Sequence, residues 1–163
     1  MKLLIASDPF GAGLKETVKE HLCSQGHTVL DVGAQSANDA VYYIEAARSL
    51  CRCILDGKGE RGILICGTGA GVSIVANKHK GIYCVPCESV FAALKSAQIN
   101  DANVIAMGAN MVGPGNACQI VDTWLASSFA MGADPERRAF LSGLLEQVYS
   151  VERENFAEGQ AGC

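Results

Sequence analysis

The chain has 163 residues, of which 49% are hydrophobic and 18% are charged. This length favours one folded domain, and the composition excludes a disordered or collagen-like chain. The 13 basic and 17 acidic residues leave a net charge of -4, which argues against nucleic-acid or membrane-surface partners. No apolar stretch approaches the ~20 residues that cross a bilayer. The N-terminal apolar run also meets Asp8 too early for a signal peptide. We therefore expect a cytoplasmic protein.

Strand and helix patterns alternate along the chain. Apolar runs predict strands at residues 2–7, 28–32, 61–66, 82–87 and 103–107. Helices are expected around residues 14–22 and at about 42–56, 70–78, 88–98, 114–128 and 135–157. The first helix is indicated by Leu14, Val18 and Leu22, which recur at a four-residue spacing. Such alternation is typical of βαβ units, whose right-handed crossovers build an open parallel sheet.

The predicted fold class is α/β, with a Rossmann-like, doubly wound, five-stranded parallel sheet and helices on both faces. We expect one domain over residues 1–163. We expect residues from about 135 to 163 to form an extended C-terminal helical segment and to pack on a partner subunit. Ligands on such sheets bind beyond the carboxyl ends of the strands. The loops after the strands are therefore the places to look for chemistry.

The most informative loop lies in residues 65–73, which read ICGTGAGVS. A buried strand delivers the Cys66 thiol, and Gly67, Gly69 and Gly71 allow a tight turn before a helix begins. The start of a helix offers free N–H donors and a partial positive charge, which stabilise an anionic oxygen or a thiolate. This combination suits aldose–ketose isomerisation through an enediolate. The glycine spacing differs from the mononucleotide and dinucleotide motifs, so ATP and NAD are not expected.

The remaining cysteines and the histidines indicate little chemistry. Most of the eight cysteines lie in apolar runs, where a reduced thiol packs as a small hydrophobe. The three histidines show no ligand spacing, and we expect neither a metal site nor disulfide bonds. The spacing of Cys84 and Cys87 leaves a thiol redox protein as a weaker alternative.

The order of several segments resembles the ribose-5-phosphate isomerase B and galactose-6-phosphate isomerase family over about residues 1–140. The shared segments are Asp8 and Gly11 after the first strand, ICGTG at 65–69, Asn77-Lys78, NDANV at 100–104 and VDTWL at 121–125. The resemblance implies an aldose–ketose isomerase of a small sugar phosphate. No metal or organic cofactor is implied.

The resemblance also implies roles for the residues around the glycine-rich loop. Cys66 matches the thiol that transfers the proton, and Thr68 matches a hydroxyl near the sugar ring oxygen and C1. Gly67, Gly69 and Gly71 match the loop that holds the enediolate oxygen.

Four further positions match residues that bind substrate in the family. Asp8 matches a carboxylate that binds sugar hydroxyls, and Tyr42 matches a tyrosine at the edge of the substrate. Asn100 matches an asparagine that binds substrate oxygens, and Arg137 matches one of two phosphate-binding arginines. Each has an alternative structural reading: Asp8 as a helix cap, Tyr42 as packing and Asn100 as part of a turn. Family members share their sites between subunits, which implies a homodimer or tetramer here.

Three positions depart from the family pattern. Pro9 and Ile99 stand where ribose-phosphate isomerases have histidines, the second of which opens the sugar ring, and Ala133 replaces a phosphate-binding arginine. A four-carbon sugar phosphate needs no such ring opening, so a tetrulose 4-phosphate or another non-ribose sugar is an alternative substrate. A non-catalytic subunit or sugar-binding member of the family is a further alternative.

Overall fold

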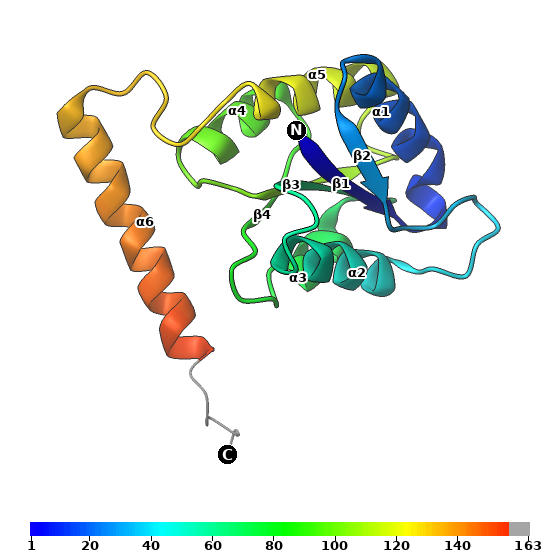
Figure 1. Ribbon diagram of the computed structural model, residues 1–163, viewed down its shortest axis with the longest axis horizontal. Coiled ribbons are helices and arrows are strands. Elements are labelled where there is room, and N and C mark those ends of the chain that lie inside the picture. The colour runs from blue at the N-terminus through cyan, green and yellow to red at the C-terminus, as the bar shows by residue number, and fades with distance from the viewer. Residues whose placement is uncertain (157–163) are drawn as a thin grey trace.

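The computed structural model describes residues 1–156 and contains one parallel sheet with helices on both of its faces (Figure 1). The strands are β1 (Lys2–Ser7), β2 (Thr28–Asp31), β3 (Arg61–Cys66), β4 (Cys84–Pro86) and β5 (Val104–Gly108). The helices are η1 (Pro9–Gly11), α1 (Ala12–Ser24), α2 (Tyr43–Leu55), α3 (Ala70–Ala76), α4 (Val90–Gln98), α5 (Pro114–Leu125) and α6 (Pro135–Asn155). The α/β class predicted from the alternating pattern is confirmed.

The strand order is β2-β1-β3-β5-β4, and every neighbouring pair is parallel. The chain moves outward from β1 to β2, returns to β3 on the other side of β1, and then continues to the far edge. The order therefore reverses between β1 and β3. In open α/β sheets, the crevice beyond the carboxyl ends of the strands at such a reversal is the usual ligand site.

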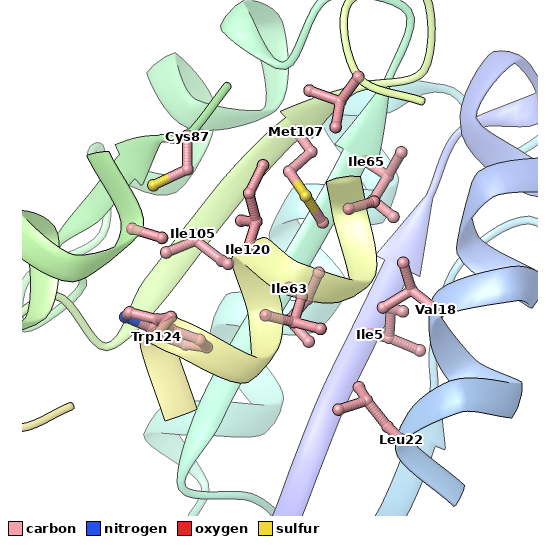
Figure 2. Close-up of a cluster of buried hydrophobic side chains, with 14 of the residues drawn as sticks. Ile5, Val18, Leu22, Ile63, Ile65, Cys87, Ile105, Met107, Ile120 and Trp124 are labelled. Carbon is pink, nitrogen blue, oxygen red and sulfur yellow. The ribbon is translucent and has the colours of Figure 1, made fainter. Parts of the chain in front are cut away.

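Two apolar cores lie on opposite faces of the sheet. One core packs β1, β3 and β5 against α1, α4 and α5, and it contains Ile63, Ile105 and the fully buried Trp124 (Figure 2). The other core packs the same strands against α2 and α3, with Leu50 and Leu64 among its members. Because both faces of these strands are covered, their sequences are continuous apolar runs rather than alternating ones.

Helix α6 is packed differently from the other helices and stands apart from the body of the molecule (Figure 1). Leu141 is its only buried residue. Four other apolar side chains of this helix are exposed: Phe140, Leu144, Val148 and Val151. Among residues 1–156, no helix is long and apolar enough to cross a membrane.

Helix α6 is tied to the body at both ends. Near its start, Arg138 donates from Nη2 to the carbonyl oxygen of Ala130 at 3.2 Å. Near its end, Glu152 accepts from the N–H of Gly81 at 2.7 Å and from the hydroxyl of Tyr83 at 3.1 Å. Helix α6 is therefore attached to the body by polar contacts near its start and near its end.

Three element boundaries differ from those predicted. A turn of 3-10 helix, η1, follows Asp8 because Pro9 starts it and the Asp8 carboxylate caps it. The helix expected over 114–128 ends at Leu125, where Arg61 donates to the carbonyl oxygens of Trp124 and Ser127. Strand β4 covers only Cys84–Pro86 of the expected 82–87. The expected end of the last helix, at 157, lies outside the described residues.

Candidate active site

Asp8 and Cys66 lie side by side at the point where the strand order reverses. The register pairs Ser7 of β1 with Ile65 of β3, so the next residue of each chain segment comes at the carboxyl edge of the sheet. The N–H of Asp8 donates to the carbonyl oxygen of Ile65 at 3.3 Å, which extends the ladder to this edge. The fold thus brings together a carboxyl group and a thiol that are far apart in sequence.

The Cys66 sulfur accepts a hydrogen bond from the N–H of Gly69 at 3.1 Å. Gly69 is the N-cap of α3 and has a φ of 78°, in the left-handed region that favours glycine. Cys66 retains an exposed fraction of 5%. The Gly69 N–H therefore points at the sulfur from the N-terminal end of α3. This geometry suits a sulfur that takes and returns a proton.

The loop that follows Cys66 rests on the loop that follows β5. The N–H groups of Ala109 and Asn110 donate to the carbonyl oxygens of Cys66 and Gly67, at 2.8 and 3.0 Å. A Cβ at Gly69 would lie 2.9 Å from the carbonyl carbon of Met107, closer than real side chains approach. Backbone contacts on this side therefore hold the loop in one shape, which is the preorganisation that oxyanion stabilisation requires.

Asp8 serves both the local structure and the site. Its Oδ1 accepts from the N–H of Gly11 at 3.0 Å and so caps η1. Burial raises the pKa of the Asp8 carboxyl, and hydrogen bonds from the N–H groups of Gly11 and Phe10 oppose that rise. The capping role considered from the sequence is therefore real.

Two tyrosines begin α2, and they are placed differently relative to the loop. Tyr42, the predicted substrate-edge residue, is the N-cap of α2 and is 60% exposed. The ring of Tyr43 lies against Gly71, where a Cβ would come within 3.0 Å of its Cδ2 and Cε2 atoms. Thr68 is exposed, and its Oγ1 accepts weakly from the N–H of Ala70 at 3.4 Å. Sequence reasoning missed Tyr43, although the glycine at 71 marks the space its ring needs.

Asn100 and Arg137 do not join Cys66 within one chain. Asn100 precedes β5 and so lies at the amino end of that strand, whereas Cys66 contacts the loop beyond its carboxyl end. Asp101, the next residue, has a φ of 49° and turns the chain sharply into the strand. Arg137 lies in the first turn of α6, with its guanidinium 5.2 Å from the Phe140 ring centroid. The predicted substrate-binding residues thus form two separate groups.

The cysteine pair that suggested redox chemistry is divided by the sheet. Cys84 belongs to the core on the α2 and α3 face, and Cys87 belongs to the core on the opposite face. Burial raises the pKa of both thiols, that of Cys87 to about 11. A dithiol that exchanges disulfides needs adjacent sulfurs and an accessible thiolate, so this arrangement does not support the redox alternative. Within residues 1–156, no three His, Cys, Asp or Glu side chains gather as a metal site would require.

Comparison with known proteins gives a consistent result. The model of the Ribose/Galactose Isomerase family matches residues 3–140. A 4-deoxy-4-sulfo-D-erythrose isomerase from Clostridium sp. (strain MSTE9) is 40% identical, over 98% of this chain and 100% of its own length. A D-erythrulose-4-phosphate isomerase from Pectobacterium atrosepticum is 38% identical, over 81% of this chain and 87% of its own. The solved structure of ribose-5-phosphate isomerase B from Clostridium thermocellum has a TM-score of 0.85 and 35% identity, over 95% of this chain and 99% of that one.

Proposed function

Because the chain belongs to the ribose/galactose isomerase family and is an aldose–ketose isomerase, we propose that its substrate is an open-chain, four-carbon sugar with a terminal anionic group. That group is a phosphate or a sulfonate. The observation that carries the chemical part of the proposal is the Cys66 sulfur, which receives the Gly69 N–H at the start of α3. The similarity to four-carbon isomerases supports the substrate class.

In the proposed reaction, the Cys66 thiolate removes the proton from C2 of the aldose. The electron pair of that C–H bond forms the C1–C2 double bond, and the carbonyl oxygen at C1 becomes an enediolate oxygen. The N–H groups of the 67–71 loop hold this oxygen. Cys66 then returns the proton to C1, and the proton of the C2 hydroxyl passes to the C1 oxygen, so that C2 becomes the ketone and C1 carries a hydroxyl. Thr68 and Asp8 are the groups at this edge that can bind the hydroxyls and relay their protons.

We further propose that the site is completed by a second copy of the chain, as a homodimer or a larger assembly. Asn100 and Arg137 lie too far along the fold to reach Cys66 of their own chain, so a neighbouring copy is the natural source of both. Helix α6 supports the same arrangement, because it presents Phe140, Leu144 and Val148 on its exposed surface. An exposed apolar row of this kind is stabilised when a partner covers it.

The four-carbon assignment has two supports besides the chemistry of the loop. Ile99 carries no group that transfers a proton, and an open-chain substrate needs no ring opening. The similarity to the 4-deoxy-4-sulfo-D-erythrose isomerase also extends through α6, over nearly the whole of both chains. Phosphate and sulfonate are tetrahedral anions of similar size with similar acceptor oxygens, so the proposal covers both groups.

Ribose 5-phosphate is the second candidate substrate. It is favoured by the close structural similarity to ribose-5-phosphate isomerase B from Clostridium thermocellum, with a TM-score of 0.85. The backbone of the 67–71 loop would serve either substrate, because both are isomerised through an enediolate. The two candidates differ in whether a cyclic sugar must first be opened.

The free thiols support a cytoplasmic location, which we also propose. All seven cysteines of the described part of the chain are unpaired. Thiols persist in this form where the cell keeps them reduced.

A substrate panel tests the proposal. The purified chain is assayed with D-erythrulose 4-phosphate, 4-deoxy-4-sulfo-D-erythrose, ribose 5-phosphate and the unphosphorylated tetroses. We expect the highest kcat/KM with one of the two four-carbon anions. A higher value with ribose 5-phosphate would transfer the assignment to the second candidate, and no turnover of any sugar would leave a non-catalytic member of the family.

A further inference from the structure

A small cavity lies between the end of α4, the turn at residues 130–133 and the start of α6. Its volume is about 190 Å³, and its lining includes Lys95, Gln98, Ile99 and Arg137. None of the residues that line it is acidic. Two positively charged side chains from different helices therefore border one cavity that holds no compensating carboxylate.

Neither cation is neutralised elsewhere in the described part of the chain. The ion pairs of residues 1–156 include neither Lys95 nor Arg137. Lys95 donates from Nζ to the neutral Oε1 of Gln98 at 3.0 Å, and this Nζ lies 5.6 Å from the Phe91 ring centroid. Two unpaired cations at one cavity attract an anion and can offer it charge-assisted hydrogen bonds.

Two carboxylates lie at the start of α6. Asp134 and Glu136 border a neighbouring depression together with Arg137 and Phe140. The Oδ1 atom of Asp134 accepts from the N–H of Arg137 at 2.7 Å, so this carboxylate is committed to capping the helix. The Asp134 carboxylate therefore caps α6, and it is not among the residues that line the cavity with Lys95 and Arg137.

A second cavity shares one lining residue with the first. Ile99 lines both, and the second cavity, of about 260 Å³, is also lined by Asn77, Asn100 and Leu144. The first cavity thus carries two cations, and the second carries the carboxamides of Asn77 and Asn100. A ligand with an anionic end and a hydroxylated end has matching partners in the two cavities.

We propose that Lys95 is a further anion-binding residue of the substrate site, acting with Arg137 from the opposite wall of the cavity to hold the terminal phosphate or sulfonate. This inference rests on the proposed function and deepens it. Lys95 supplies a positive charge to a cavity in which position 133 has only a methyl group. Helix α4 carries Lys95 and ends two residues before Asn100, so it fixes the spacing between these two proposed substrate contacts.

The test replaces Lys95 with methionine, which keeps the aliphatic stem, and with arginine, which keeps the charge. Lys58→Met is the matched control, because Lys58 is an exposed lysine that pairs with Asp56. We expect Lys95→Met to raise KM for a four-carbon sugar phosphate or sulfonate at least about tenfold, as loss of a charge-assisted hydrogen bond implies. The kcat/KM for unphosphorylated erythrulose should stay within about twofold, since that sugar lacks the group Lys95 binds. Lys95→Arg should restore most of the affinity.

A binding measurement separates failure of this inference from failure of the proposed function. Titration calorimetry with inorganic phosphate should show weaker binding by Lys95→Met than by the wild type or Lys58→Met, whatever the substrate proves to be. Equal phosphate binding and equal KM in all three proteins would overturn the role of Lys95 and leave the isomerase intact. A parallel fall in kcat/KM for charged and uncharged sugars would also overturn it, because that result indicates a structural role. If the wild type isomerises no tetrose, the phosphate titration alone decides whether Lys95 binds an anion.

Discussion

The two ends of the sheet are built by different means. At the carboxyl end, the loop after Cys66 is held by backbone hydrogen bonds from Ala109 and Asn110, and Gly69 has no room for a Cβ beside the backbone of Met107. At the other end, Asn100 lies in a turn, and Arg137 lies on a helix with one buried residue. The first region is held in place by contacts within one chain. In the second region, by contrast, α6 leaves Phe140 and Leu144 exposed.

With the roles that we propose, this difference separates the group that moves the proton from the groups that recognise the rest of the substrate. A group that moves a proton must be placed to within a fraction of an ångström, so it is carried by the most rigid part of the fold. Groups that recognise the far end of a substrate tolerate more variation, and here Ile99 and Ala133, near Asn100 and Arg137, depart from the family pattern. The chemistry of the family can therefore be kept while its substrate changes.

The sharpest test of the rigid region is Cys66→Ser. We expect exchange of the C2 proton of the substrate with solvent to fall by at least ~100-fold, as loss of a general base implies. The melting temperature should change little, because serine fits the same space. Cys118→Ser, on α5 and away from the loop, is the control and should exchange at the wild-type rate. Exchange by Cys66→Ser at that rate would contradict the assignment of the base.

Mixing two inactive variants tests whether the regions meet between chains. Cys66→Ser and Arg137→Met are produced separately, then unfolded and refolded together. If each site takes Cys66 from one copy and Arg137 from another, random mixed dimers regain about a quarter of the wild-type sites. A mixture of Cys66→Ser with Thr68→Ala, both in the same region, should regain none. Recovery of activity in neither mixture would argue for a site within one chain.

Most of the fold could be predicted from the sequence because the strands are buried on both faces. Runs such as residues 61–66 are apolar without interruption, and that pattern together with intervening helices admits few arrangements. The 3-10 turn after Asp8 was missed because it covers only three residues. No periodicity can be recognised in so short a segment.

The site was predictable only where it depends on local sequence. Cys66 and its glycines are contiguous, and their helix start follows from the pattern. Which of Tyr42 and Tyr43 faces the loop depends on where α2 begins, since successive helical residues point about 100° apart. Helix starts are the least predictable feature of a sequence. The separation of Asn100 and Arg137 from Cys66 depends on the topology of the whole sheet.

Two glycines with left-handed backbones test why the rigid loop holds its shape. Gly69 has a φ of 78° and close neighbours, whereas Gly132 has a φ of 74° and open space around a would-be Cβ. Gly132→Ala should therefore lower the free energy of unfolding by only the ~1–2 kcal/mol of the left-handed conformation. Gly69→Ala should cost more, because its Cβ also meets the backbone of Met107. Urea denaturation measures both, and equal losses would show that the contact contributes nothing.

The smallest expected effect concerns the attachment of α6 at Tyr83. Burial, followed by the hydrogen bond to Glu152 and its charge, raises the pKa of the Tyr83 hydroxyl. A tyrosine whose pKa is higher in the folded chain contributes stability below its unfolded pKa, near 10, and loses it as the pH rises further. Tyr83→Phe should therefore lower the free energy of unfolding by about 1 kcal/mol at neutral pH. Above pH ~10 the difference from the wild type should narrow.

Denaturation curves recorded from pH 7 to 11 check this prediction, with Glu152→Gln as the second variant. That variant keeps the length of the side chain and removes its charge. It should therefore weaken the contact between Tyr83 and residue 152 while the tyrosine side chain stays in place. If neither variant differs from the wild type at any pH, the contact between Tyr83 and Glu152 does not hold α6. The helix would then be positioned by Leu141, by Arg138 and by the neighbouring copy that we propose, so that the placement of Arg137 would depend on assembly.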